Sequence, residues 1–243
     1  MLKVKVLPPS QTFKGLSYGD WAAIWSNWFS SRGLDRYDGE DILFLRVHAD
    51  FKVVSDAEGA MRYKDPESFL DMTGHKKKRI LHGTALFVPL AVSIIAIGED
   101  HEGKLIHNEK DLRTAVNDDI SHIRSIWATV KVNHSKQSIK LVPDLRFYRV
   151  ETPLFKLTVP EDSDLNNLID YPMKPGVHDA VTEGYFILLP DLPPSTYQFD
   201  FGSEGPGDYS TRSVYDVTVY RNKRKEPLDI SSSIKLKFKS KKD

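Results

Sequence analysis

The chain has 243 residues, a formal net charge of +0 and no cysteine. The length suffices for a buried core, and the absence of a charge bias argues against a general affinity for nucleic acids or membranes. Disulfides and thiolate metal sites are therefore excluded. The lack of cysteine is compatible with a protein of the reducing cytoplasm and with a particle that is assembled in the cytoplasm and later released.

The N-terminal stretch predicts a short strand, Leu2–Val6, and not a signal peptide, because Lys3 and Lys5 interrupt its apolar residues. The longest apolar run, Thr84–Ile97, is shorter than the roughly 20 residues that a membrane-spanning helix needs. We therefore expect a soluble protein with no signal peptide and no transmembrane segment.

The clearest helix pattern covers residues 17–32. Ser17 suits the N-cap, and Asp20 three residues later resembles a capping box. The large apolar residues Trp21, Ile24, Trp25 and Trp28 follow at helical spacing and share one face. We predict that this structural Trp cluster packs across one end or open edge of a β-sandwich. The alternative is an aromatic platform for a sugar ring or a partner.

A second helix is predicted at Glu109–Ser121, with Asn108 as its N-cap. Its inward residues are Leu112, Ala115, Val116 and Ile120. Before it, strands are predicted at Asp41–His48 and, as one long or two short strands around Pro89, at Thr84–Gly98. The intervening Ala49–Arg79 is predicted to be irregular, with a short helix at Pro66–Met72.

The remaining sequence has the alternation of apolar and polar residues that is typical of half-buried strands. Strands are predicted at Ser125–Val132, Ser138–Leu141, within Tyr148–Asp162, within Asp179–Gly202, at Ser213–Arg221 and at Asp229–Phe238. The predicted fold is mainly β: a jelly-roll-like β-sandwich with one or two peripheral helices. Residues 1–222 form its single domain, and residues 223–243 form a basic C-terminal strand or tail.

No motif predicts catalysis, a cofactor or a metal ion. Gly98–Lys104 has the glycine spacing of a phosphate-binding loop, but Leu105 stands where such a loop has a magnesium-binding Ser or Thr. We therefore interpret this segment as a charged turn. The pair His101 and His107 lacks a zinc-motif spacing, and the acidic turns Asn117–Asp119 and Glu161–Asp164 lack the twelve-residue calcium pattern. Carboxylates on separate strands can still converge without a sequence trace, so a hydrolase remains a third alternative.

The C-terminal segment Ile234–Lys242 begins with alternating apolar and basic residues, which places the lysines on one strand face. The basic side chains in question are Lys235, Lys237, Lys239 and Lys241. They indicate either an edge strand protected from aggregation or an arm that adds a strand to a neighbouring subunit. In the second case, deletion of Arg221–Asp243 is expected to weaken assembly and leave the monomer folded.

Four motifs resemble an uncharacterised family of β-rich proteins of bacteria and marine tailed phages. They are Tyr18–Trp21 followed by Trp25 and Trp28, then Tyr148–Phe155, Gly184–Gly202 and Tyr215–Val219. Bacterial members look exported and often carry cysteines. Because this chain lacks both features, it is more similar to the phage branch, whose members resemble virion components.

The resemblance implies a non-enzymatic structural protein of a tailed-phage virion, such as a capsid decoration, neck or tail-associated component. Its expected partners are other virion proteins in a homo-oligomer or symmetric assembly, with no membrane and no nucleic acid. It would be made in the host cytoplasm and reside in the virion. The alternative is a ligand- or carbohydrate-binding sandwich in which Tyr209, in a glycine-rich loop, contacts the ligand.

Overall fold

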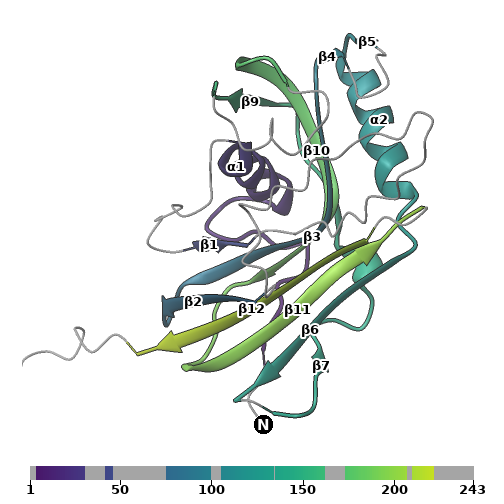
Figure 1. Ribbon diagram of the computed structural model, residues 1–243. Helices are drawn as coiled ribbons and strands as arrows, with labels where there is room; N and C mark the ends of the chain where they lie inside the picture. The colour runs from purple at the N-terminus through teal and green to yellow at the C-terminus, as the bar shows by residue number, and fades with distance from the viewer. Residues whose placement is uncertain are drawn as a thin grey trace, which may run out of the picture.

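Two five-stranded β-sheets pack face to face and form the body of the protein (Figure 1). The computed structural model describes residues 4–30, 42–45, 75–99, 105–133, 135–161, 173–206 and 210–221. The first sheet consists of β1 (Ile42–Phe44), β3 (Ala85–Ala96), β10 (Gly176–Leu189), β8 (Arg149–Glu151) and β9 (Phe155–Val159). The second sheet has the order β2 (His75–Leu81), β12 (Ser210–Tyr220), β11 (Ser195–Glu204), β6 (Ser125–Val132) and β7 (Ile139–Lys140). The predicted β-sandwich with peripheral helices is confirmed.

Strand pairing makes both sheets mixed. β3 and β10 are antiparallel along most of their length, and their register shifts next to Phe186, which lies opposite Pro89. Proline has no N–H to donate and is tolerated at such a bulge, so 85–96 remain one continuous strand. β1 with β3 and β2 with β12 are parallel pairs, whereas a jelly roll in its simplest form is antiparallel throughout. The short strands β4 (Gly98–Glu99) and β5 (Leu105–Ile106) form a separate pair.

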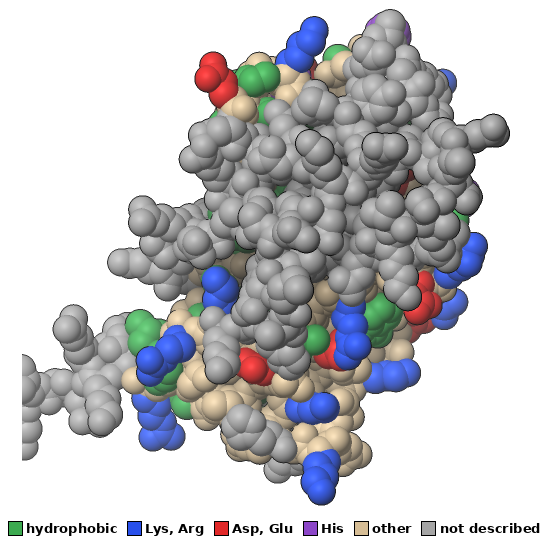
Figure 2. All heavy atoms as spheres, viewed as in Figure 1, with side chains coloured by type: hydrophobic (Ala, Val, Ile, Leu, Met, Phe, Trp, Pro, Cys, Tyr) green, Lys and Arg blue, Asp and Glu red, His purple; other side chains and the backbone are tan. Residues whose placement is uncertain are grey.

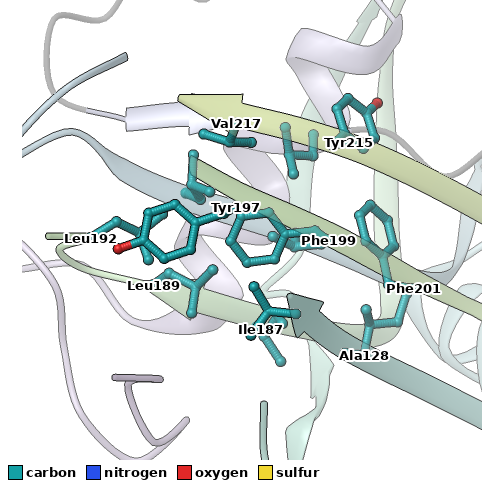
Figure 3. Close-up of a cluster of buried hydrophobic side chains, with 14 of the residues drawn as sticks. Ala128, Ile187, Leu189, Leu192, Tyr197, Phe199, Phe201, Tyr215 and Val217 are labelled. Carbon is teal, nitrogen blue, oxygen red and sulfur yellow. The ribbon is translucent and has the colours of Figure 1, made fainter. Parts of the chain in front are cut away.

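The main core lies between the two sheets. Tyr197, Phe199 and Phe201 alternate along β11 and point toward the first sheet, where they meet Ile187 and Leu189 of β10 (Figure 3). All five side chains are at most 2% exposed. Burial of each such side chain stabilises the fold by about 1.5–3 kcal/mol relative to leaving it in water. This core therefore fixes the position of β11 and of its neighbour β6.

Helix α1 (Tyr18–Ser30) covers the opposite face of the first sheet. Trp25 is 3% exposed, stacks on Phe29 at 5.1 Å between ring centroids, and meets Phe186 of β10 edge-on. Ser17 and Asp20 bond to each other's backbone N–H, which confirms the predicted capping pair. The helix bonds to the open edge of β9 through Asn27 and Ser30, as the predicted packing against an open edge requires. It does not lie across one end of the sandwich, because the even-numbered residues of β10 present a second apolar face that the Trp cluster covers.

Helix α2 (Glu109–Ser121) matches its predicted bounds. The side chain of Asn108 accepts a hydrogen bond from the backbone N–H of Asp111, as expected of an N-cap. Leu112, Val116 and Ile120 are buried, and Ala115 is partly buried against the same cluster. The helix lies on β3 and β10 beside the second sheet, where these long strands continue past the sandwich (Figure 1).

Several predicted elements differ from the structure. Residues 4–6 form no strand, and the next residue, Leu7, makes an isolated β-bridge to Leu188. His75–Leu81 is a strand and not irregular, because it pairs in parallel with β12. Tyr148–Asp162 contains two strands separated by the extended residues around Pro153, and not one. The predicted Pro66–Met72 helix, the Asp229–Phe238 strand and the 223–243 tail lie outside the described residues.

Candidate interaction site

A groove is lined by the first half of β6 and by residues 140 and 142–146, next to the edge strand β7 of the second sheet. Figure 1 shows β7 beside β6 at this edge of the sheet. The groove has a volume of about 330 Å³, and we call it the β6 groove. One wall is formed by Arg124 and residues 125–129 of β6, and the other by residues 140 and 142–146. Its volume lies at the lower end of the range of ligand-binding clefts.

The groove exists because β7 leaves β6 early. β7 pairs with β6 only at Ile139 and Lys140, and the backbone N–H of Leu141 donates one further hydrogen bond to Ala128 at 3.0 Å. Pro143 then has no N–H for a ladder, and the chain turns into the 3₁₀ helix η1 (Leu145–Tyr148). The first residues of β6 are therefore left with one neighbouring strand, β11, in the part of the chain that the structure describes.

The groove is positively charged. No carboxylate among the described residues pairs with Arg124 or Lys140, and both are exposed. Arg146 donates to Asp144, with 2.7 Å between Nη2 and Oδ2 and 3.0 Å between Nε and Oδ1. These side-chain bonds and the bond from the Arg146 backbone N–H lower the pKa of Asp144 to about 2. This aspartate stays ionised and neutralised by Arg146, so the charges of Arg124 and Lys140 remain available to a partner.

An exposed aromatic residue, Phe147, comes next in the chain after the groove residue Arg146. A 3₁₀ helix has three residues per turn, so Leu145 and Tyr148 share one side, and both pack against the core between the sheets. Phe147 lies on the other side and is 77% exposed. Two anchored neighbours therefore fix a phenyl ring in solvent beside a cationic groove, an arrangement that suits a protein contact.

The outward face of the second sheet carries a fixed indole. Gly202 of β11 leaves room for Trp127, because a Cβ at this glycine would come within 2.7 Å of the indole Cζ2. Trp127 donates from Nε1 to Asp200 at 3.1 Å, and Arg212 bonds to the other oxygen of this carboxylate at 2.7 Å. Burial raises the pKa of Asp200, but the bonds from Arg212 and Trp127 outweigh it and lower the pKa overall. Lys and Arg side chains are spread over this face (Figure 2).

A second polar cluster lies between α2 and the first sheet. Arg149 of β8 donates to Glu183 at 2.6 Å and to the Asn117 side chain at 2.9 Å. Ser93 of β3 donates to Asp119 at 2.6 Å. Asp119 and one oxygen of Glu183 thus have partners in the fold, whereas the buried Oε2 of Glu183 has none among the described residues. We interpret the cluster as the attachment of α2. Asn117–Asp119 belong to this helix, so the predicted acidic turn is wrong.

The residues predicted from the sequence fall into two groups. Trp21 and Trp25 are buried and donate from Nε1 to backbone oxygens of Phe13 and Leu45, so they are core residues and not an exposed platform; Trp28 packs on Phe44. Five others lie outside the described residues: Tyr209, Lys235, Lys237, Lys239 and Lys241. The same holds for His101 and for residues 100–104 and 162–164 of the loops considered above.

Among the described residues, no three His, Cys, Asp or Glu side chains gather into a metal-binding group. Sequence reasoning missed the β6 groove and Phe147. The available signal was Pro143-Asp144 directly after a very short strand, which marks a change of chain direction.

The comparisons with known proteins add no relative: no family model, curated protein or solved structure matches the chain. In the part of the chain that the structure describes, no helix is both long and apolar enough to cross a membrane.

Proposed function

We propose that the protein is a non-enzymatic assembly component of a tailed-phage particle, as a capsid decoration, neck or tail-associated protein. The observation that carries the assembly role is Phe147, whose ring is 77% exposed on an anchored turn beside the β6 groove. Aromatic side chains on fixed backbone are typical anchors of protein interfaces. The resemblance of the sequence to virion proteins supports the location in a particle.

Quantitative peptide mass spectrometry on density-purified particles from the producing culture tests this function. We expect the chain at a fixed ratio to the major capsid protein. The ratio would distinguish a shell component from a neck or tail ring. Absence of the chain from the particles would overturn the virion role.

A variant links incorporation to the site. Phe147→Ala is expected to reduce the copy number per particle at least several-fold, because the anchor is lost. The matched control is Val177→Ala, since Val177 is also apolar and 63% exposed but belongs to β10. Equal incorporation of both variants would show that Phe147 is not part of the interface.

Saccharide binding is the second candidate function, and Trp127 is the observation that favours it. Its indole lies over Gly202 with the polar pair Asp200 and Arg212 beside it, and fixed aromatic rings next to polar groups suit sugar rings. Screening the purified protein on immobilised glycans tests this role. Binding that disappears in Trp127→Ala would favour it over assembly, and absence of binding would reject it.

A further inference from the structure

We infer that the β6 groove receives an extended acidic segment of a partner protein, which pairs with the open edge of β6 as an added strand. The inference rests on the proposed assembly function and names the chemistry of the partner. Three independent features of the described residues support it: an unpaired strand edge, unpaired cations and an exposed aromatic ring.

The strand edge offers backbone hydrogen bonds. The carbonyl of Ala128 accepts a bond from Leu141, so the backbone of Ala128 faces the groove side. Backbone groups alternate between the two sides of a strand, so the N–H and C=O of Ile126 also face that side. No described strand pairs with β6 there, because the ladder with β7 stops at Lys140. An incoming extended segment can complete this ladder.

The charge of the groove selects an acidic segment. Arg124 and Lys140 lie at the groove and have no carboxylate partner among the described residues. Glu or Asp side chains of an added strand would meet these cations, whereas Lys or Arg would be repelled. The C-terminal segment of the same chain, residues 222–243, is rich in lysine and arginine and is therefore a poor occupant. A second protein with an acidic strand fits better.

The exposed ring offers an apolar contact next to a groove residue in the chain. Phe147 directly follows the groove residue Arg146 and projects into solvent. An apolar side chain at the end of the added strand would cover this ring, and backbone pairing would fix the register between the two. The expected partner segment is thus a short run of alternating acidic and apolar residues.

The test uses the full chain and three blocked hexapeptides. The probe is acetyl-Glu-Val-Glu-Phe-Glu-Val-amide. One control replaces each Glu by Lys, and the other carries an N-methyl group on every backbone amide so that neither of its edges can donate hydrogen bonds to β6. Titrations followed by NMR give the dissociation constant and the residues whose amide signals shift. We expect the acidic probe to shift the signals of residues 124–128 and 146–147, and both control peptides to bind at least about ten-fold more weakly.

Charge-matched variants locate the binding. Arg124→Glu with Lys140→Glu is expected to weaken binding of the acidic probe at least about ten-fold, which corresponds to about 1.4 kcal/mol. Lys110→Glu with Lys174→Glu makes the same change in net charge on exposed residues outside the groove and is expected to leave binding unchanged. Equal loss in both double variants, or equal binding of the N-methylated peptide, would overturn the inference.

The outcomes separate this inference from the proposed function. If the acidic probe binds in the groove but the chain is absent from particles, the virion role fails and the strand-addition site stands. If the chain is present in particles but the probe does not bind, the inference fails and the assembly role stands on another surface.

Discussion

The strand edges of β9 and β6 differ in whether side chains of the same chain cover them. At β9, helix α1 covers the edge: Asn27 accepts from the N–H of Thr158 at 2.9 Å and donates to the carbonyl of Lys156 at 3.0 Å. Ser30 donates to the carbonyl of Thr158 at 2.8 Å. At β6, the edge next to Ile126 faces a groove, and no described strand or helix completes it.

The difference indicates which edge is available to a partner. Exposed strand edges invite pairing with other chains, and proteins usually cover or charge them. The side-chain amide and hydroxyl groups of α1 form hydrogen bonds with the backbone of β9, as an additional strand would. The β6 edge instead carries cations that admit an acidic strand and repel a basic one. The strand edge is therefore covered at β9, whereas at β6 it is accessible and favours an acidic partner strand.

The largest expected effect comes from loosening the helix that closes the β9 edge. Trp25→Ala is expected to lower the free energy of unfolding by about 3–5 kcal/mol, because it removes a buried ring and leaves the carbonyl of Leu45 without its indole donor. Urea denaturation measures this change. A loss below about 1 kcal/mol would show that α1 is not a part of the core.

A smaller effect is expected from Asn27→Ala. The N–H of Thr158 and the carbonyl of Lys156 lose their side-chain partner, which costs about 0.5–1.5 kcal/mol because both groups are exposed and water can replace the amide. Amide hydrogen exchange at Thr158 should become faster, and the variant should self-associate at high concentration. Unchanged exchange at Thr158 would contradict the view that Asn27 closes this edge. Thr114→Ala, on the exposed side of α2, serves as a helix control.

The pH dependence of the groove turn follows from Asp144. Its pKa is lowered from 3.8 to about 2 by the bonds from Arg146, so it stabilises the fold above pH 3.8. This contribution is lost as the pH falls from 3.8 through about 2. NMR titration of the Asp144 carboxyl carbon measures the midpoint. A midpoint near 3.8 would show that Arg146 does not hold this carboxylate in solution.

The smallest effect on stability is expected at the β6 edge itself. Phe147→Ala, and separately Arg124→Glu with Lys140→Glu, should change the free energy of unfolding by no more than about 0.5 kcal/mol, because these side chains are exposed. Thermal denaturation followed by circular dichroism measures it. A loss of several kcal/mol in either variant would place these residues in the fold and not in an interface.

Local signals predicted some of these elements well. The bounds of α2 follow from Asn108 as N-cap and from the spacing of Leu112, Val116 and Ile120, and β6 follows from alternation. These patterns depend on nearby residues only. The Trp pattern of α1 predicted burial, but not that the helix covers an outer sheet face, since both faces of β10 are apolar over part of its length.

Non-local pairing explains what the sequence did not predict. The basic run at 75–79 becomes a strand through parallel pairing with β12, more than a hundred residues later in the chain. The β6 groove depends on the residue at which β7 separates from β6. The packing of Leu145 and Tyr148 against the core determines that position. Neither property has a periodicity that a single sequence displays.

Site-specific photo-crosslinking in the particle tests whether a partner protein covers the β6 groove. A photoreactive p-benzoylphenylalanine replaces Phe147 in cells that produce the particles, and a control replaces the exposed Lys110 of α2. We expect position 147 to crosslink to one structural protein, at a peptide that contains alternating acidic and apolar residues, and position 110 not to crosslink. Crosslinking at 110 but not at 147, or at neither position in assembled particles, would contradict a partner at the β6 groove.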